Sequence, residues 1–167
     1  MNNELYEKLT CLDEADSRKN IEDDLISQSE DLITHLLKLY YWRNTSTREY
    51  WTKEVAGTYM KVSKQSMNNK YPTVDFIEKC IWYNWENDAS LDYIISKLMN
   101  SQEYVNYARL YPINRITPAA KAFCKLYVRW LAETLSSKGK HNNQEAVKIL
   151  EELLSMEDYE LIRACRF

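Results

Sequence analysis

The sequence predicts an all-α protein, and three observations lead to that prediction. Only two glycines and three prolines occur among the 167 residues. Both residue types serve turns and irregular loops, so their scarcity favours long regular elements. Apolar residues recur at helical spacing, and hydroxyl or amide side chains stand where helices would begin. We expect one domain over 1–167, a single compact bundle of about seven to eight helices.

Helix starts can be placed from their capping residues. The expected helices are 3–12, 20–43, 47–67, 74–86, 91–110, 118–137, 143–155 and 157–165. Ser46 and Glu49 have the spacing of a capping box, in which the hydroxyl and the carboxylate each satisfy a free backbone N–H. Thr117 directly precedes Pro118, which suits the first position of a helix. The expected caps are thus Ser46, Thr73, Thr117 and Asn142.

The 20–43 helix is amphipathic. Its apolar residues fall in one broad sector at 100° per residue, and charged residues occupy the remainder. The apolar sector consists of Ile21, Leu25, Leu32, Ile33, Leu36, Leu37 and Tyr40. We expect this sector to face the core.

The 118–137 helix is apolar around most of its circumference. Its charged residues follow one another at i+4 and form a narrow ridge of Lys121, Lys125, Arg129 and Glu133. A helix that is apolar on nearly every other side must be surrounded by protein. The sequence therefore predicts that this helix is central and that the others pack around it.

Two helices carry aromatic residues that could face a partner. In 91–110, the core face is expected to be Leu91, Ile94, Ile95, Leu98, Met99 and Val105. Four tyrosines lie almost opposite it, within roughly 60° of one another: Tyr93, Tyr104, Tyr107 and Tyr111. The 74–86 helix is apolar on two sides, one of which carries Phe76 and Tyr83. Exposed tyrosines make good interface anchors, although another helix of the chain could instead cover these faces.

Composition and motifs argue against most enzyme classes. The chain lacks a G-x-S-x-G nucleophile motif, and two isolated glycines cannot build a phosphate-binding loop. Neither the four cysteines nor the two histidines have metal-ligand spacing, so we expect no metal and no cofactor. His35 lies four residues after Asp31, which leaves a metal-dependent hydrolase as a minor alternative.

The net charge and the apolar segments of the sequence indicate which partners and which compartment to expect. Net charge is −3, from 22 basic and 25 acidic residues, which argues against a nucleic-acid partner. The ridge of Lys121, Lys125 and Arg129 could still contact phosphates or an acidic protein. We identify no signal peptide and no membrane-length apolar segment, so we expect a protein of the cytoplasm, either of the producing cell or of a host cell, with no membrane partner.

Two resemblances support a helical fold. The segment His35-Leu-Leu-Lys-Leu-Tyr-Tyr-Trp42, followed by Trp51, Glu54-Val55, Tyr71-Pro72 and Phe76, resembles the bacterial helical family known as domain of unknown function twenty-nine. This resemblance covers only about 31–91 and implies no catalytic residue, because that family has no established activity.

A looser resemblance covers more of the chain. Leu39-Tyr-Tyr-Trp-Arg43, Ala122-Phe-Cys-Lys-Leu-Tyr-Val-Arg-Trp130 and the two last expected helices are similar to poxvirus immunomodulators with a B-cell-lymphoma-type helical bundle. The Asn-Trp-Gly-Arg element of their cellular relatives is missing here. This resemblance implies a central apolar helix and a role in binding host proteins.

Together these observations predict a protein that is not an enzyme and acts by binding another protein. An inhibitor or adaptor fits best, such as an immunity protein or an antagonist of host defence. The same tyrosine face would also suit a second copy of the chain. The alternative function is a small helical subunit of a ribonucleoprotein complex.

Overall fold

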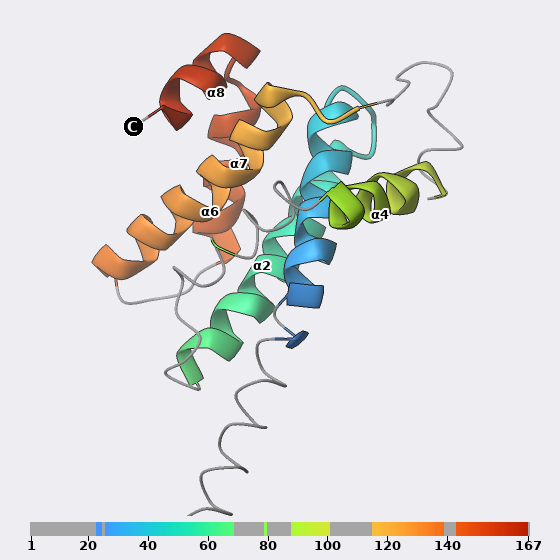
Figure 1. Ribbon diagram of the computed structural model, residues 1–167. Coiled ribbons are helices and arrows are strands. Elements are labelled where there is room, and N and C mark those ends of the chain that lie inside the picture. The colour runs from blue at the N-terminus through green and yellow to red at the C-terminus, as the bar shows by residue number, and fades with distance from the viewer. Residues whose placement is uncertain are drawn as a thin grey trace, which may run out of the picture.

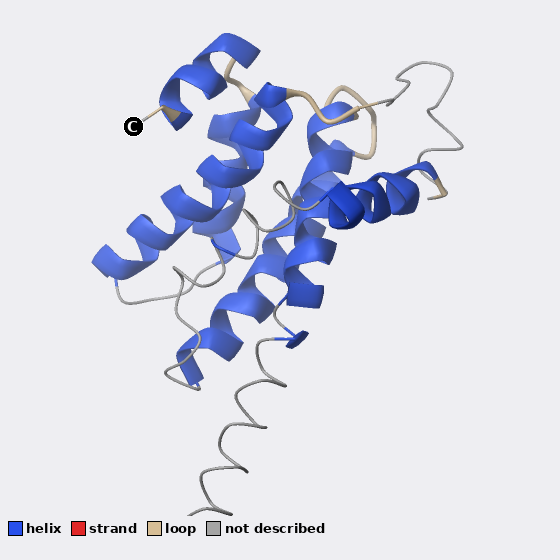
Figure 2. Ribbon diagram, in the orientation of Figure 1, coloured by secondary structure: helices blue, strands red, loops and turns tan. Residues whose placement is uncertain are grey.

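The computed structural model describes residues 23–24, 26–68, 79, 88–100, 115–138 and 143–166. Every regular element in these ranges is a helix, which confirms the all-α prediction (Figure 2). The helices are 26–41, α2 (Arg48–Asn68), α4 (Asp88–Met99), α6 (Pro118–Lys138), α7 (Asn143–Leu154) and α8 (Asp158–Cys165). The predicted helices 3–12 and 74–86 lie outside the described residues, apart from Lys79.

Figure 1 shows how these helices are arranged. The 26–41 helix and α2 run side by side, with α4 on one side of this pair and α6, α7 and α8 on the other. The buried side chains of all six helices form one continuous hydrophobic cluster. The arrangement leaves the outer face of α4 at one edge of the molecule and α8 at another.

The 26–41 helix and α2 form an antiparallel hairpin. The rings of Trp42 and Trp51 lie 5.6 Å apart at the closed end, and His35 Nδ1 lies 3.7 Å from Glu54 Oε1 further along. In the turn, the Thr45 hydroxyl donates to the Trp42 carbonyl at 2.8 Å. The hairpin thus places the apolar face of the 26–41 helix against the apolar face of α2.

The predicted capping box at Ser46 and Glu49 is wrong by one residue. α2 begins at Arg48, so Ser46 stays in the turn, where its side chain is exposed. Glu49 pairs with Lys53 at 3.5 Å. The hydroxyls of Thr45 and Thr47 lie 3.0 Å apart and stabilise the turn in this register.

The start of α6 agrees with the sequence. Thr117 Oγ1 accepts a hydrogen bond from the Ala120 amide at 3.2 Å, which confirms the predicted cap. The Tyr41 hydroxyl accepts from the Thr117 amide and donates to the Arg115 carbonyl, both at 3.1 Å. The end of the 26–41 helix therefore holds the start of α6 in place.

α6 buries most of its described side chains and packs against both α7 and α8. The buried residues are Ala119, Ala120, Ala122, Phe123, Cys124, Leu126, Tyr127, Val128 and Leu131. Phe123 contacts the Tyr40 ring, with centroids 5.4 Å apart, and Tyr127 meets the Tyr59 ring edge to face at 5.5 Å. These aromatic pairs join α6 to the helical hairpin.

α4 differs from the predicted 91–110 helix at both ends. It begins at Asp88 and ends at Met99, and Asn100 lies in a turn. Ile94 and Leu98 are buried as predicted, but Met99 is 45% exposed and does not join the core face. Met99 lies at the edge of the apolar sector and in the last turn, where none of the described helices covers it.

Candidate functional site

The outward face of α4 is the candidate site. Ile94 and Leu98 fix the orientation of the helix because both are fully buried. At 100° per residue, the exposed residues of α4 then share an arc of about 120° on the opposite side. They are Asp92, Tyr93, Ser96, Met99 and the following Asn100.

Tyr93 is the central feature of this face. Its side chain is 51% exposed. Lys97, one turn later, places its Nζ 4.7 Å from the centre of the tyrosine ring. Such a cation–π contact at an exposed site contributes about 0.5–1 kcal/mol and restrains both side chains.

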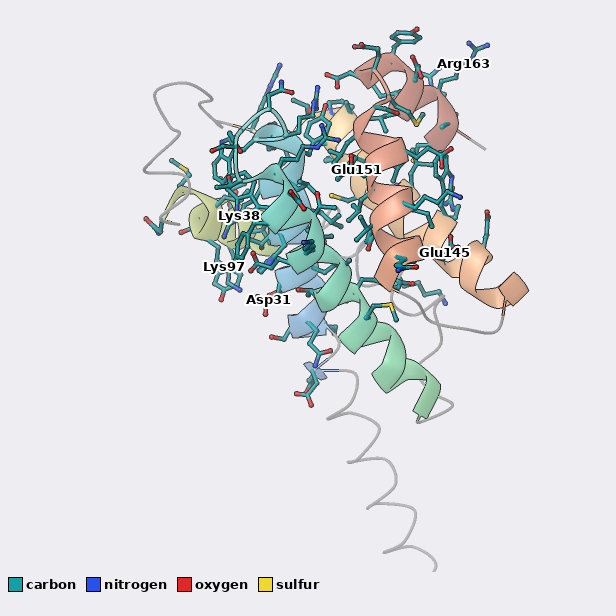
Figure 3. All side chains as sticks on the ribbon, turned by 180° about the vertical axis from the view of Figure 1, so that it is seen from behind. Asp31, Lys38, Lys97, Glu145, Glu151 and Arg163 are labelled. Carbon is teal, nitrogen blue, oxygen red and sulfur yellow. The ribbon has the colours of Figure 1, made fainter. Side chains whose placement is uncertain are left out.

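Lys97 is itself fixed by a residue of the neighbouring helix. Its Nζ donates to Asp31 Oδ1 at 3.0 Å (Figure 3). Burial opposes the charge on Lys97, but the hydrogen bond and the negative charge of Asp31 outweigh it and raise the pKa of the lysine. Lys97 is therefore a permanent cation at neutral pH that links Tyr93 to Asp31.

The outward face of α4 offers both apolar and polar atoms to a partner. Tyr93 and Met99 present apolar surface, while Asp92 and Ser96 between them provide polar atoms. Within the described ranges, no three residues among His, Cys, Asp and Glu come together as metal ligands would.

Asp31 and His35, which the sequence paired, each contact a residue of a neighbouring helix in the structure. Asp31 bonds to Lys97 on α4, and His35 lies 3.7 Å from Glu54 on α2. The ion pair of Asp31 with Lys97 and the contact of His35 with Glu54 each join two neighbouring helices. These contacts do not bring Asp31 and His35 together as the catalytic pair that the hydrolase alternative requires.

The basic ridge of α6 is only half exposed. Lys121, Lys125 and Arg129 are each partly buried, and each takes part in an interaction within the chain. Their partial burial limits how much of the ridge a phosphate or an acidic protein could reach. The other predicted binding residues, Phe76, Tyr83, Tyr104, Tyr107 and Tyr111, lie outside the described residues.

Two further exposed tyrosines were missed by the sequence analysis. Tyr50 on α2 is 65% exposed, and Tyr159 on α8 is 66% exposed. Both lie far from the apolar sector of their own helix on a helical wheel, a signal that could have identified them. Between α2 and α7 there is also a groove of about 520 Å³, lined by Lys53, Ala56, Gln144 and Val147.

None of the described helices combines the length and the apolar character that a membrane crossing requires. A comparison of the chain with protein-family models, curated proteins and solved structures found no match. The two resemblances noted in the sequence therefore stay predictions.

Proposed function

We propose that this protein acts by binding another protein, as an inhibitor or adaptor rather than as an enzyme. The observation that carries the proposal is the exposed ring of Tyr93, held in place by Lys97 and Asp31. Tyrosine is enriched among the residues that dominate binding energy because it buries a large ring at little cost in side-chain entropy.

Restraint of Tyr93 before binding favours this role. A side chain that is already ordered loses less conformational entropy when a partner covers it. The Lys97 ammonium holds the ring from one side, and Asp31 holds the ammonium. The ring can therefore enter an apolar pocket of a partner as a preformed anchor.

The surroundings of Tyr93 suit a protein partner. Met99 adds exposed apolar surface at the opposite edge of the same face, and its flexible thioether adapts to irregular surfaces. Asp92 is exposed on the same face of α4, where its negative charge would guide association with a basic surface. We place the partner in the cytoplasm and assign the protein to the class of immunity or anti-defence antagonists.

A rigid scaffold supports this surface. We propose that α6 is the central helix of a bundle of about seven to eight helices, as its apolar circumference suggests. Its many buried side chains and its packing against α7 and α8 favour this position. The rigid interior would let the outer helices present fixed side chains to a partner.

The test compares two exposed tyrosines. The tagged protein is used to isolate partners from cells that make it, with nuclease added, and the captured proteins are quantified for wild type, Tyr93→Ala and Tyr50→Ala. We expect Tyr93→Ala to weaken capture of the partner about tenfold or more. Tyr50→Ala should leave capture unchanged, since that residue lies on α2 at a similar exposure.

Other results would contradict the proposal. If both variants retain the partner fully, Tyr93 is not an anchor. If recovery depends on nucleic acid and disappears with nuclease, the ribonucleoprotein alternative is correct. Self-association that Tyr93→Ala abolishes, measured by sedimentation, would identify a second copy of the chain as the partner.

A further inference from the structure

The groove between α2 and α7 has the dimensions of a ligand site. The two helices are antiparallel here, since Arg48 at the start of α2 pairs with Glu151 near the end of α7, and Lys53 faces Gln144 across the groove. The Arg48 ion pair holds the helices together at one end. The groove measures about 520 Å³, within the range of about 300–1,000 Å³ that small-molecule sites occupy.

The inner part of the groove is apolar. Ala56 is only 1% exposed, and Val147 is half-buried and packs against the core. Water that meets these two side chains makes few hydrogen bonds, so an apolar molecule that displaces it gains binding energy. Lys53 and Gln144 are exposed and supply the polar atoms of the described lining.

Gly57 shows that α2 also leaves space beside the groove. It follows Lys53 by four residues and therefore lies next to it on the same side of the helix. A Cβ atom at Gly57 would meet no described atom within 4 Å. Glycine inside a helix costs about 1 kcal/mol relative to alanine, and contacts among the described residues do not account for it. A molecule that approaches the backbone of α2 closely would account for it.

The charges at the rim of the groove cancel in pairs. Lys53 Nζ lies 3.5 Å from Glu49 Oε1, one turn earlier on α2, and Arg48 pairs with Glu151. These two pairs give the described rim no net charge that would attract an ion. The Gln144 side chain carries both a donor and an acceptor, which suits a hydroxyl, amine or amide group. The rim therefore favours an uncharged ligand with a hydrogen-bonding group.

We propose that this groove binds a small uncharged molecule, largely aromatic or aliphatic, with one polar group. The apolar body lies over Ala56 and Val147, and the polar group reaches Gln144. A protein segment is a poorer fit, because stable protein interfaces bury about 1,200 Å² or more. The site shares no residue with the outward face of α4, so it is independent of the function proposed above.

The test uses N-phenyl-1-naphthylamine, an uncharged aromatic amine whose fluorescence increases in apolar surroundings. We expect saturable binding of one probe per chain, with a Kd of about 1–100 µM. Val147→Trp fills the groove from α7 and should weaken binding about tenfold or more. Gln144→Trp should do the same from the exposed rim, where the added ring does not disturb the core.

Gly57→Leu separates a blocked site from an unfolded protein. A helical side chain covers the turn before its own residue, so the leucine would lie beside Lys53 and obstruct the groove. Leucine is also a better helix former than glycine, and the space at this position is open. We expect this variant to melt at the same or a higher temperature than wild type and to bind the probe at least fivefold more weakly.

The control variant is Glu152→Leu, which adds an apolar side chain at an exposed position of α7 about 140° from Val147. We expect it to bind the probe like wild type, as should Tyr93→Ala. A lack of saturable binding by wild type would overturn the proposal, as would wild-type affinity in all three groove variants. The anionic relative 1-anilinonaphthalene-8-sulfonate should bind more weakly than the uncharged probe, and tighter binding of the sulfonate would overturn the uncharged class. Circular dichroism and thermal melting of each variant confirm that the bundle remains folded.

Discussion

The Tyr40 hydroxyl donates a hydrogen bond of 2.5 Å to Asp158 Oδ1, across a separation of 118 residues. Arg43 Nη2 lies 3.8 Å from the same carboxylate oxygen, and its guanidinium carbon lies 4.7 Å from the centre of the Tyr40 ring. These three side chains fasten the first turn of α8 to the end of the 26–41 helix.

The contact predicts a loss of stability in alkali. Burial, followed by the hydrogen bond to Asp158, raises the pKa of Tyr40 to about 12. The unfolded chain loses this proton near pH 10 and the folded chain keeps it, so the unfolded state binds fewer protons between these values. The free energy of unfolding should therefore fall as pH rises from 10 to 12, by roughly 2 kcal/mol from this group.

Urea unfolding of wild type and Tyr40→Phe across this range measures that contribution. Wild type should be the more stable protein at pH 8, where the hydrogen bond is intact. The difference between the two proteins should then shrink towards pH 12. A difference that stays constant with pH would show that the Tyr40 hydroxyl has an ordinary pKa.

Tyr127→Phe should stabilise the protein. The Tyr127 side chain is fully buried, and its hydroxyl has no hydrogen-bond partner among the described residues. An unsatisfied buried polar atom costs about 1–3 kcal/mol, while phenylalanine keeps the edge-to-face contact with Tyr59. We expect an increase in Tm of about 2–4 °C by calorimetry for each 1 kcal/mol gained. A lower Tm would mean that the hydroxyl is satisfied in solution.

Thr117→Ala should destabilise the start of α6. The variant loses the hydrogen bond from the Ala120 amide to Thr117 Oγ1, and such caps contribute about 1 kcal/mol. Thr117→Ser retains the oxygen and serves as the matched control. Chemical denaturation should show a lower midpoint for Thr117→Ala than for wild type and Thr117→Ser. Equal midpoints for all three proteins would show that the Thr117 hydroxyl does not stabilise the start of α6.

Arg48→Gln should change stability very little. The ion pair of Arg48 with Glu151 joins α2 to α7, but both side chains are substantially exposed. Exposed ion pairs contribute about 0–1 kcal/mol because water and salt screen them. Thermal melts of wild type and variant should nearly coincide at physiological salt, and a large loss would show that this pair is shielded from solvent.

Local signals explain which parts of the fold could be predicted. The start of α6 was found because Thr117 and Pro118 each favour a helix N-terminus for their own chemical reasons. The helix at 26–41 was found because its apolar sector is broad and continuous. Both features depend on residues that are close in sequence.

Features that depend on distant residues were missed or misplaced. The predicted capping box at Ser46 was misplaced by one residue. α2 begins at Arg48, and the hydroxyls of Thr45 and Thr47 contact each other in the turn before it. The sequence gives no sign that Lys97 reaches Asp31, since the two lie on different helices. For the candidate site, the position of Tyr93 was predicted, but the ion pair that holds its ring was not.

The link from Tyr40 to Asp158 also has a consequence for how the chain is made. A ribosome synthesises Asp158 long after the 26–41 helix has left the exit tunnel. Tyr40 therefore cannot form its hydrogen bond to Asp158 until most of the chain has been made. Contacts between residues far apart in sequence form slowly, because a long loop must close first. The hairpin of 26–41 and α2 would therefore expose apolar surface until α6 and α8 complete the core.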